Sequence, residues 1–337
     1  MKISEERKKQ IIIYLLEKIY QKHESISKTV MEAFDINQNT VHRYINQLVD
    51  DGVIRRVKRG QYELVSNVHE YNITKGEKTM VDDTVAYTRY LSPLIQEFGN
   101  NVQHIWNYTF SEMMNNVIDH ANAEKVSIIV EQNYLSTTAI IVDDGIGIFQ
   151  KIKEYFNFET LEEAIGELFK GKLTTDAKNH SGEGIFFSSK MMDDFFIVSS
   201  GKIFTTNKFD NTRIIDMASE NTKGTIVLMK LSNYTNKEAK EVFDLYANVD
   251  GGFIRTRIPL KNFFETSPVS RSQAKRVCNR LEKFKEVILD FDGVDWIGQA
   301  FAHQLFVVFA KEHQDITLHP ENMNQDISKM YNHVLLQ

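Results

Sequence analysis

The 337-residue chain contains a single cysteine, Cys278. One cysteine excludes an intramolecular disulfide, and this scarcity favours a reducing compartment. The chain also lacks any run approaching the roughly 20 apolar residues that a membrane-spanning helix needs, and its first residues are charged, unlike those of a secretory signal. We therefore expect a cytoplasmic protein with no membrane segment.

An excess of positive charge is also lacking. The formal net charge of −6 gives no global signal for nucleic-acid binding, so any such binding has to be local. Residues 1–65 carry 12 Lys and Arg against 9 Asp and Glu, which is +3 and leaves −9 for the remainder. The hydrophobic fraction of 42% is that of an ordinary globular chain, and the length predicts two or three domains.

The N-terminal part reads as three helices followed by a hairpin. Apolar residues at helical spacing predict helices over 11–20 and 37–48, and a serine cap predicts a short helix over 27–34 between them. Alternating residues over 53–64 predict a β-hairpin that turns near Arg59 and Gly60.

The phrase from Thr40 to Ile54 resembles the winged helix-turn-helix of bacterial transcription regulators. The resemblance implies binding of duplex DNA, with the third helix in the major groove and the basic hairpin on phosphate. The alternative is that this unit binds a protein and not DNA. The residues expected to contact DNA are Asn39, His42, Arg43, Arg55, Arg56, Lys58 and Arg59, with Gln38 and Asn46 beside them.

The middle of the chain carries three short motifs in order. In the first, Glu112 and Asn116 lie four residues apart and share one helix face. A carboxylate there can orient or deprotonate a water, and an amide oxygen can ligate Mg²⁺. In the second, Asp143 ends the apolar run 138–142, which predicts a buried strand.

Glycines complete the second motif and form the third. Gly145 and Gly147 allow a tight turn where backbone can approach a flat base. Gly182 and Gly184 open a loop into the helical pattern 185–192, whose first amides are suited to phosphate oxygens. The ordered trio predicts one nucleotide pocket.

The trio resembles the N box, G1 box and G2 box of the GHKL ATPase superfamily over roughly residues 80–232, and Glu-x-x-x-Asn-x-x-x-His is most similar to the anti-sigma kinase branch. The resemblance implies ATP and Mg²⁺ as cofactors. It makes Glu112 the general base, Asn116 the Mg²⁺ ligand and Asp143 the acceptor from the adenine amino group. The other implied nucleotide-binding residues are His120, Gly145, Gly147, Gly182, Gly184 and Thr225.

Residues 148–180, between the second and third motifs, correspond to the ATP lid of that superfamily. A helix is expected over 158–169 and a mobile stretch over 171–180. Lys172 is a candidate for contact with the γ-phosphate, with a solvated surface lysine as the equal alternative. Lys178 is expected to be a solvated surface lysine.

Two features depart from the family pattern. Phe186 replaces a third glycine of the G2 box, and Asp119 stands where histidine kinases often carry a basic residue. No dimerisation helix with a phospho-acceptor histidine precedes the N box. These features separate the chain from ordinary sensor histidine kinases.

The C-terminal part alternates strands with helices, which favours an α/β layer. The run 287–298 resembles the STAS domain of anti-anti-sigma factors, but no serine stands at the helix start, where Gly298 and Gln299 lie. We therefore expect a protein-interaction module without phosphorylation at that site. Ser270, near Arg255 and Arg271, is interpreted as a helix cap in preference to an anion site.

The sequence thus predicts an α/β multidomain protein. The units are a winged helix over 1–66, a linker over 67–84, a GHKL α/β sandwich over 85–235 with a mixed sheet and helices on one face, and a STAS-like α/β domain over 241–337. The expected function is that of an ATP-binding bacterial regulator, in which slow Mg²⁺-dependent hydrolysis controls binding of DNA or a partner protein. A serine/threonine kinase of anti-sigma type, a non-enzymatic ATP-bound scaffold in a defence or toxin–antitoxin system, and a homodimer stay open.

Overall fold

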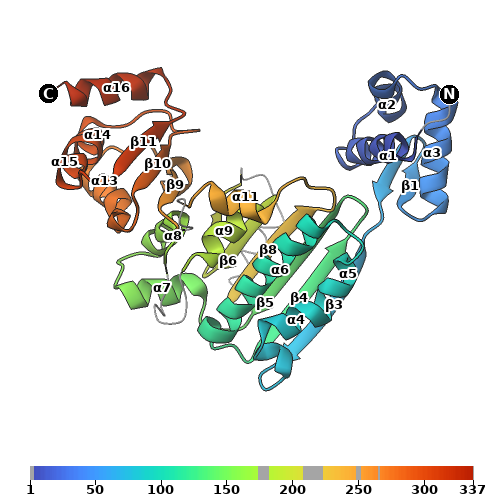
Figure 1. Cartoon of the computed structure of the whole chain (residues 1–337), viewed down its shortest axis with the longest axis horizontal. Helices are drawn as coiled ribbons and strands as arrows, with labels where there is room; N and C mark the ends of the chain where they lie inside the picture. Colours follow the sequence, from blue (N-terminus) through green and yellow to red (C-terminus); the bar gives the residue numbers. More distant parts are fainter. Residues whose placement is uncertain (1–3, 174–181, 208–222, 248–251, 265, 337) are drawn as a thin grey trace.

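The computed structural model describes residues 4–173, 182–207, 223–247, 252–264 and 266–336. An N-terminal helical unit, a central sheet with its helices, and a C-terminal sheet with its helices follow one another across the molecule (Figure 1). This arrangement confirms the α/β multidomain class. Among the described residues, no helix has the length and apolar character needed to span a bilayer.

The N-terminal unit contains the three helices and the hairpin expected there. Ser4 begins the first helix, and Asn37 begins the third with its side chain accepting from the Thr40 amide at 2.9 Å. The apolar sides of the helices, including Val41, Ile45 and Leu48, are buried against one another. The elements are α1 (Glu5–Tyr20), α2 (Ile26–Phe34), α3 (Gln38–Asp50), β1 (Ile54–Lys58) and β2 (Gln61–Leu64).

The central sheet has six strands in the order β3-β4-β5-β8-β6-β7. Every pairing among the described strands is antiparallel, so the expected mixed sheet is wrong. Connectivity explains two of the five pairings, because short turns join β4 to β5 and β6 to β7, and such turns force antiparallel neighbours. The strands are β3 (Asn67–Thr74), β4 (Lys125–Gln132), β5 (Ser136–Asp143), β6 (Asp194–Ser199), β7 (Lys202–Thr205) and β8 (Thr225–Ser232).

Residues 67–84, expected to be a linker, begin with the edge strand β3, so that expectation is wrong. Only every second side chain of β3 turns toward the interior: His69 and Tyr71 are half-buried and Ile73 is buried. The remaining side chains of this edge strand are exposed and mostly polar, so its sequence resembles that of a linker. A 3-10 turn, Lys78–Met80, follows.

Helices cover one face of the central sheet (Figure 1). The longest, α6, buries Trp106 and Phe110 completely, each contributing roughly 1.5–3 kcal/mol relative to an exposed side chain. The helices on this face are α4 (Asp83–Tyr90), α5 (Ser92–Ile95), α6 (Asn100–Asn115), α9 (Gly184–Met191) and α11 (Ala239–Asp244).

The segment between the second and third motifs contains two helices, α7 (Ile148–Phe156) and α8 (Leu161–Lys170). The expected helix over 158–169 is therefore present as α8. Most of the stretch expected to be mobile, including Lys178, lies in 174–181, outside the described residues.

The C-terminal unit has a parallel sheet of order β11-β10-β9. Parallel neighbours need crossover connections, and helices supply them here, as the alternating pattern predicted. The elements are β9 (Arg255–Pro259), α12 (Leu260–Phe263), α13 (Arg271–Cys278), a 3-10 turn (Leu281–Lys283), β10 (Glu286–Asp290), α14 (Gln299–His303), a π-helical stretch (Gln304–Phe309), α15 (Ala310–Glu312), β11 (Thr317–Glu321) and α16 (Gln325–Leu335).

The N-terminal unit contacts the central sheet through aromatic rings. The Lys230 ammonium lies 4.9 Å from the centre of the Tyr20 ring and donates to its hydroxyl at 3.1 Å, while Lys9 lies over Tyr234 at 4.9 Å. Lys230 lies near the C-terminal end of β8 and Tyr234 two residues beyond it, whereas Thr225 stands at the other end of the strand. The N-terminal unit therefore sits at the end of the sheet opposite to the second motif.

Candidate functional site

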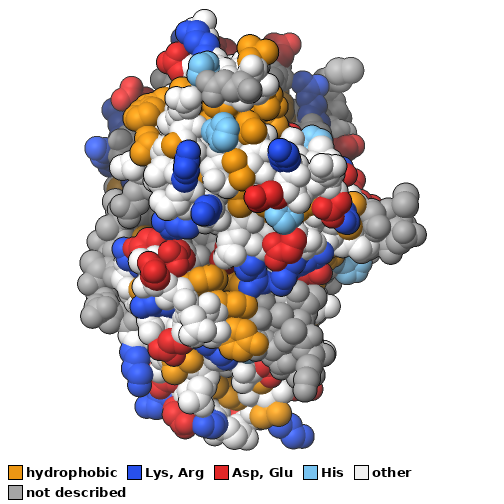
Figure 2. Space-filling view, turned by 90° about the vertical axis from the view of Figure 1, so that its left-hand side faces the viewer, with side chains coloured by type: hydrophobic (Ala, Val, Ile, Leu, Met, Phe, Trp, Pro, Cys, Tyr) orange, Lys and Arg blue, Asp and Glu red, His pale blue; other side chains and the backbone are white. Residues whose placement is uncertain are grey.

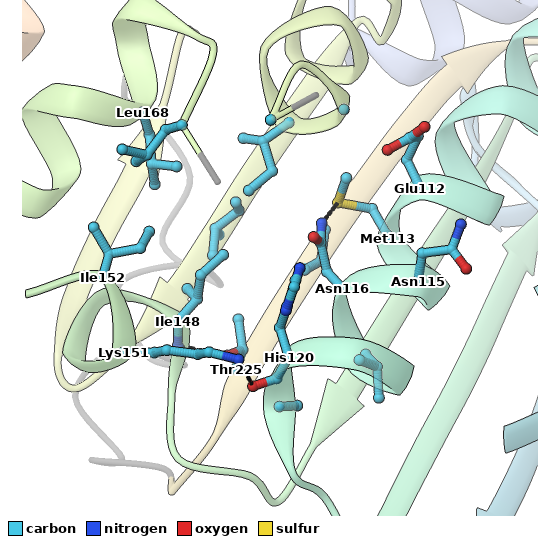
Figure 3. Close-up of a pocket in the computed structure, with 18 of the residues that line it drawn as sticks. Glu112, Met113, Asn115, Asn116, His120, Ile148, Lys151, Ile152, Leu168 and Thr225 are labelled. Atoms are coloured by element: carbon cyan, nitrogen blue, oxygen red, sulfur yellow. Dashed lines mark hydrogen bonds between the residues drawn. The ribbon is translucent and has the colours of Figure 1, made fainter. Parts of the chain in front are cut away.

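The three motifs meet at one cavity of about 390 Å³, bounded by α6, β5, α7, α8 and α9 (Figure 3). This volume is within the range of small-molecule sites. Of the ten residues that the sequence assigned to the nucleotide site, eight line the cavity: Glu112, Asn116, His120, Asp143, Gly147, Gly182, Gly184 and Thr225.

The first motif lies where a helix changes form. After Asn115, α6 continues as a π-helical turn, Asn116–Ala121, which Asn122 ends with a left-handed φ of 52°. The Asn116 Nδ2 lies 3.9 Å from the Met113 Sδ (Figure 3), so the amide donates to sulfur and keeps its oxygen as a potential ligand. Single π-helical turns inside α-helices are often found at functional sites.

Asp143 is only 4% exposed at the end of β5. Burial raises the pKa of its carboxyl group, and hydrogen bonds from the Gly145 amide, at 2.8 Å, and from Thr225 oppose the rise. The Thr225 hydroxyl also accepts from the Ile148 amide at 3.1 Å. The carboxylate is therefore held in place in the cavity wall, where it can accept a hydrogen bond from a ligand.

The two glycines of the second motif are needed for close packing. A Cβ at Gly145 would collide with the Ala121 carbonyl oxygen, and one at Gly147, where φ is 85°, would lie 2.6 Å from the Ser199 hydroxyl. Gly147 lines the cavity, whereas Gly145 does not. Gly145 instead lets the loop approach the π-helical turn, and so it supports the wall from behind.

The glycines of the third motif bring α9 close to the first motif. Gly182 has a φ of 73°, and a Cβ there would lie 2.5 Å from the Leu173 backbone. A Cβ at Gly184 would collide with the Glu112 carboxylate. The first turn of α9 therefore lies against the Glu112 side chain, where backbone amides can bind an anion.

Lys172 is not brought to the cavity. Its ammonium donates to the Lys283 carbonyl at 3.0 Å and lies over the rings of Phe253 and Phe284 at 5.4 and 5.1 Å. Burial lowers the pKa of this lysine, and Glu183 opposes the change. In this conformation, Lys172 contacts the C-terminal unit in place of a ligand.

One cavity residue, Lys151, was missed, and so was Tyr108, which does not line the cavity but interacts with the charge of Glu112. Lys151 lines the cavity and donates to the His120 carbonyl at 2.7 Å. Tyr108 stands one helical turn before Glu112, and its pKa is raised first by burial and then by the charges of Glu112 and Glu183. Helical spacing from Glu112 and from Ile148 would have found Tyr108 and Lys151.

Phe186, which stands where the resemblance to GHKL ATPases would have a third glycine, is buried and packs on rings of the C-terminal unit. Its ring lies 4.9 Å from that of Tyr246 and 4.8 Å from that of Phe253. The bulky side chain is accommodated because it points into this aromatic cluster as well as lining one end of the cavity.

The donor set of the cavity fits Mg²⁺ in the way nucleotide sites hold it. Glu112 and Asn116 supply oxygen atoms from one helix face. Throughout the described residues, no three His, Cys, Asp or Glu side chains gather into a metal-binding group. Because Mg²⁺ keeps several waters and binds one or two protein oxygens together with substrate phosphates, a dedicated cage is not required.

The residues assigned to DNA contact are all exposed on the N-terminal unit. Asn39, His42 and Arg43 line a shallow depression along α3, and the hairpin carries the basic residues beside it. Arg56 donates to Asn46 at 2.6 Å, so hairpin and helix are linked. The depression also includes two carboxylates, Asp50 and Asp51, so positive charge is concentrated on the hairpin.

Among the described side chains at the opposite end of the molecule, positive charge is not concentrated in this way. Figure 2 views the end that carries the C-terminal unit, where basic and acidic side chains are interspersed. On the sheet there, Arg255 pairs with Glu286 and Arg257 with Asp290, both at 2.7 Å. Ser270 forms a capping box with Gln273 at the start of α13, as the cap interpretation of this serine predicted.

Residues 273–328 match the profile of a protein family described as a STAS-like domain of unknown function (DUF4325). The match confirms the expected STAS-like character for this part of the C-terminal unit. A comparison with curated proteins found no match.

Proposed function

We propose that the cavity binds ATP with Mg²⁺ and that the chain is a nucleotide-dependent regulator resembling GHKL ATPases. The observation that carries this proposal is the convergence of eight motif residues on a single cavity. Further support comes from the buried Asp143 carboxylate and from the start of α9, which both line this cavity and are suited to a base and to phosphates.

The residues divide the chemistry among them. Asp143 would accept a hydrogen bond from the adenine amino group, and amides at the start of α9 would bind phosphate oxygens. Asn116 would hold Mg²⁺ through its oxygen, and the ion neutralises phosphate charge when bound. Glu112 would take the proton from a water that attacks the γ-phosphate, which ends as inorganic phosphate beside ADP.

Replacing Asp143 with asparagine is expected to weaken ATP binding by roughly 10- to 150-fold, the range of a hydrogen bond to a charged group. The asparagine amide can turn a donor toward the adenine amino group, which is itself a donor. Isothermal titration of the full chain with ATP and Mg²⁺ measures the change.

The neighbouring carboxylate provides the control for this substitution. Asp144 accepts from the Glu124 and Lys125 amides at 2.8 and 3.0 Å and does not line the cavity. Asp144→Asn should leave ATP affinity unchanged. Wild type should also prefer ATP to inosine triphosphate, which has a carbonyl in place of the amino group. Equal affinity of wild type and Asp143→Asn for ATP would refute the assignment.

We further propose that the N-terminal unit binds duplex DNA through α3 and the hairpin. Support comes from the exposure of Asn39, His42 and Arg43 on one helix and of a basic cluster on the adjoining hairpin. The hairpin arginines would contact phosphate and the helix would read base edges. The STAS-like segment would bind a partner protein.

Changing Arg55, Arg56 and Arg59 together to alanine is expected to reduce DNA affinity at low salt at least tenfold. The slope of log affinity against log salt should become shallower by about 0.9 for each lost phosphate contact. Fluorescence anisotropy with labelled duplex at several salt concentrations measures both. A variant with Lys8, Lys18 and Lys28 changed to alanine removes equal charge from α1 and α2 and should bind normally. Equal loss in both variants contradicts a hairpin contact.

A further inference from the structure

One helix is shared by the cavity and the C-terminal unit. On one side, Leu168 and Gly171, at the end of α8, line the cavity. On the other side, α8 packs closely on the C-terminal unit, since a Cβ at Gly166 would lie 2.7 Å from the Phe263 ring. Gly171 approaches Phe253 in the same way, at 2.8 Å. Movement of α8 would therefore change both the cavity wall and this packing.

A buried lysine joins α8 to the end of α13. The Lys170 ammonium donates to the carbonyls of Arg276 and Asn279 at 3.0 and 2.6 Å. Asn279 is the C-cap of α13, so a lysine from another unit satisfies carbonyls at this helix end and complements its dipole. Lys170 is also paired with Glu167 at 2.6 Å, and Arg280 approaches the same carboxylate at 3.4 Å.

The chain beyond α8 is bound by the same part of the C-terminal unit. Arg280 donates to the Lys172 carbonyl at 2.9 Å, and Lys283 donates to it at 3.3 Å. The next residue, Leu173, lines the cavity and donates its amide to the Gly182 carbonyl at 3.0 Å. One arginine of the matched STAS-like segment therefore holds the backbone that leads directly into the cavity wall.

Because the charges of this network are buried, the contact between α8 and α13 is stable only while the geometry of the network is kept. Glu167 and Lys170 are 4% and 1% exposed at their side chains, and Arg280 is 14% exposed, so one carboxylate faces two cations out of water. The desolvation of these charges is offset only when the ion pairs and hydrogen bonds are all made, so the network favours one arrangement of α8 against α13. A change in α8 would break several of these bonds together.

We propose that the contact between α8 and α13 couples the cavity to the STAS-like segment, with Arg280 as a positioning residue for the wall around Leu173. The inference rests on the proposed nucleotide binding. A ligand that needs this wall stabilises the α8–α13 contact, and by reciprocity an ordered contact strengthens ligand binding. Binding of a partner to the STAS-like segment would thus change nucleotide affinity.

The test uses the full chain with Mg²⁺ and the non-hydrolysable analogue adenylyl imidodiphosphate. Amide hydrogen exchange of α13 and the following 3-10 turn should slow at least threefold when the analogue binds wild type. Arg280→Met should weaken analogue binding by about 5- to 20-fold, within the usual range of coupling between sites, and should abolish the slowing. Lys275→Met, which removes an exposed cation from α13 itself, should change neither result.

Three outcomes would overturn the proposal, and each of them rejects a different part of it. If wild type binds no analogue, the proposed function fails and the coupling fails with it. If wild type binds but exchange in α13 does not respond, the coupling alone fails. If Arg280→Met binds and protects like wild type, Arg280 has no positioning role. Should this variant lose protection in β4 and β5, it is unfolded, and Arg280→Lys decides by the same criteria.

Discussion

Changing Glu112 to glutamine is expected to lower ATP hydrolysis by roughly 10²- to 10⁴-fold, the contribution of a positioned general base. Affinity for ATP should stay within about threefold, because glutamine keeps the shape and the polar contacts of the side chain. A coupled assay for released phosphate, run beside a binding titration, separates the two quantities.

The structural reason for this expectation is the position of the carboxylate. Glu112 lines the cavity directly against Gly184, so the base stands beside the helix start that would bind phosphates. Glu183→Gln is the matched control, since Glu183 is the N-cap of α9 and its carboxylate does not line the cavity. If Glu112→Gln hydrolyses ATP at the wild-type rate, Glu112 is not the base. If wild type binds ATP without turnover, the cavity is a binding switch.

Eight of the ten residues that the sequence assigned to the site line the cavity, because their motifs carry local signals. Glu112 and Asn116 follow helical spacing, and Asp143 follows an apolar strand. Glycines at 147 and 182 have left-handed backbones that other residues rarely adopt, so they mark turns directly. Such features can be predicted from a few neighbouring residues, without knowing which distant parts of the chain they contact.

What could not be predicted depends on contacts between distant segments. β3 resembles a linker because an edge strand exposes most of its residues, and its pairing with β4 joins residues more than fifty positions apart. Lys172 was a candidate for phosphate contact, yet Lys283 and two aromatic rings hold it elsewhere. Phe186 stands where the GHKL resemblance would have a glycine, and its ring packs on Phe253 of the C-terminal unit, a contact that the local sequence does not reveal.

The buried pair of Glu167 and Lys170 is expected to dominate the stability of the C-terminal contact. Lys170→Met should lower the free energy of unfolding by about 3–5 kcal/mol, because removing one partner of a buried pair leaves the other charge poorly compensated, here with only Arg280 at 3.4 Å. Here it also leaves the Arg276 and Asn279 carbonyls without their donor. Burial lowers the pKa of Lys170 although Glu167 opposes the change, which reflects how costly this charge is to desolvate.

Urea unfolding measured on the full chain tests this expectation, and an exposed pair provides the comparison. Lys202 and Glu162 are also 2.6 Å apart, but their side chains are 42% and 40% exposed. Lys202→Met should therefore cost less than about 1 kcal/mol. The double variant Glu167→Leu with Lys170→Met should recover only part of the lost stability: it removes the poorly compensated Glu167 charge, but Arg280 loses its carboxylate and two carbonyls still lack a donor. Equal effects of Lys170→Met and Lys202→Met would mean that distance, and not burial, sets the strength of the contact.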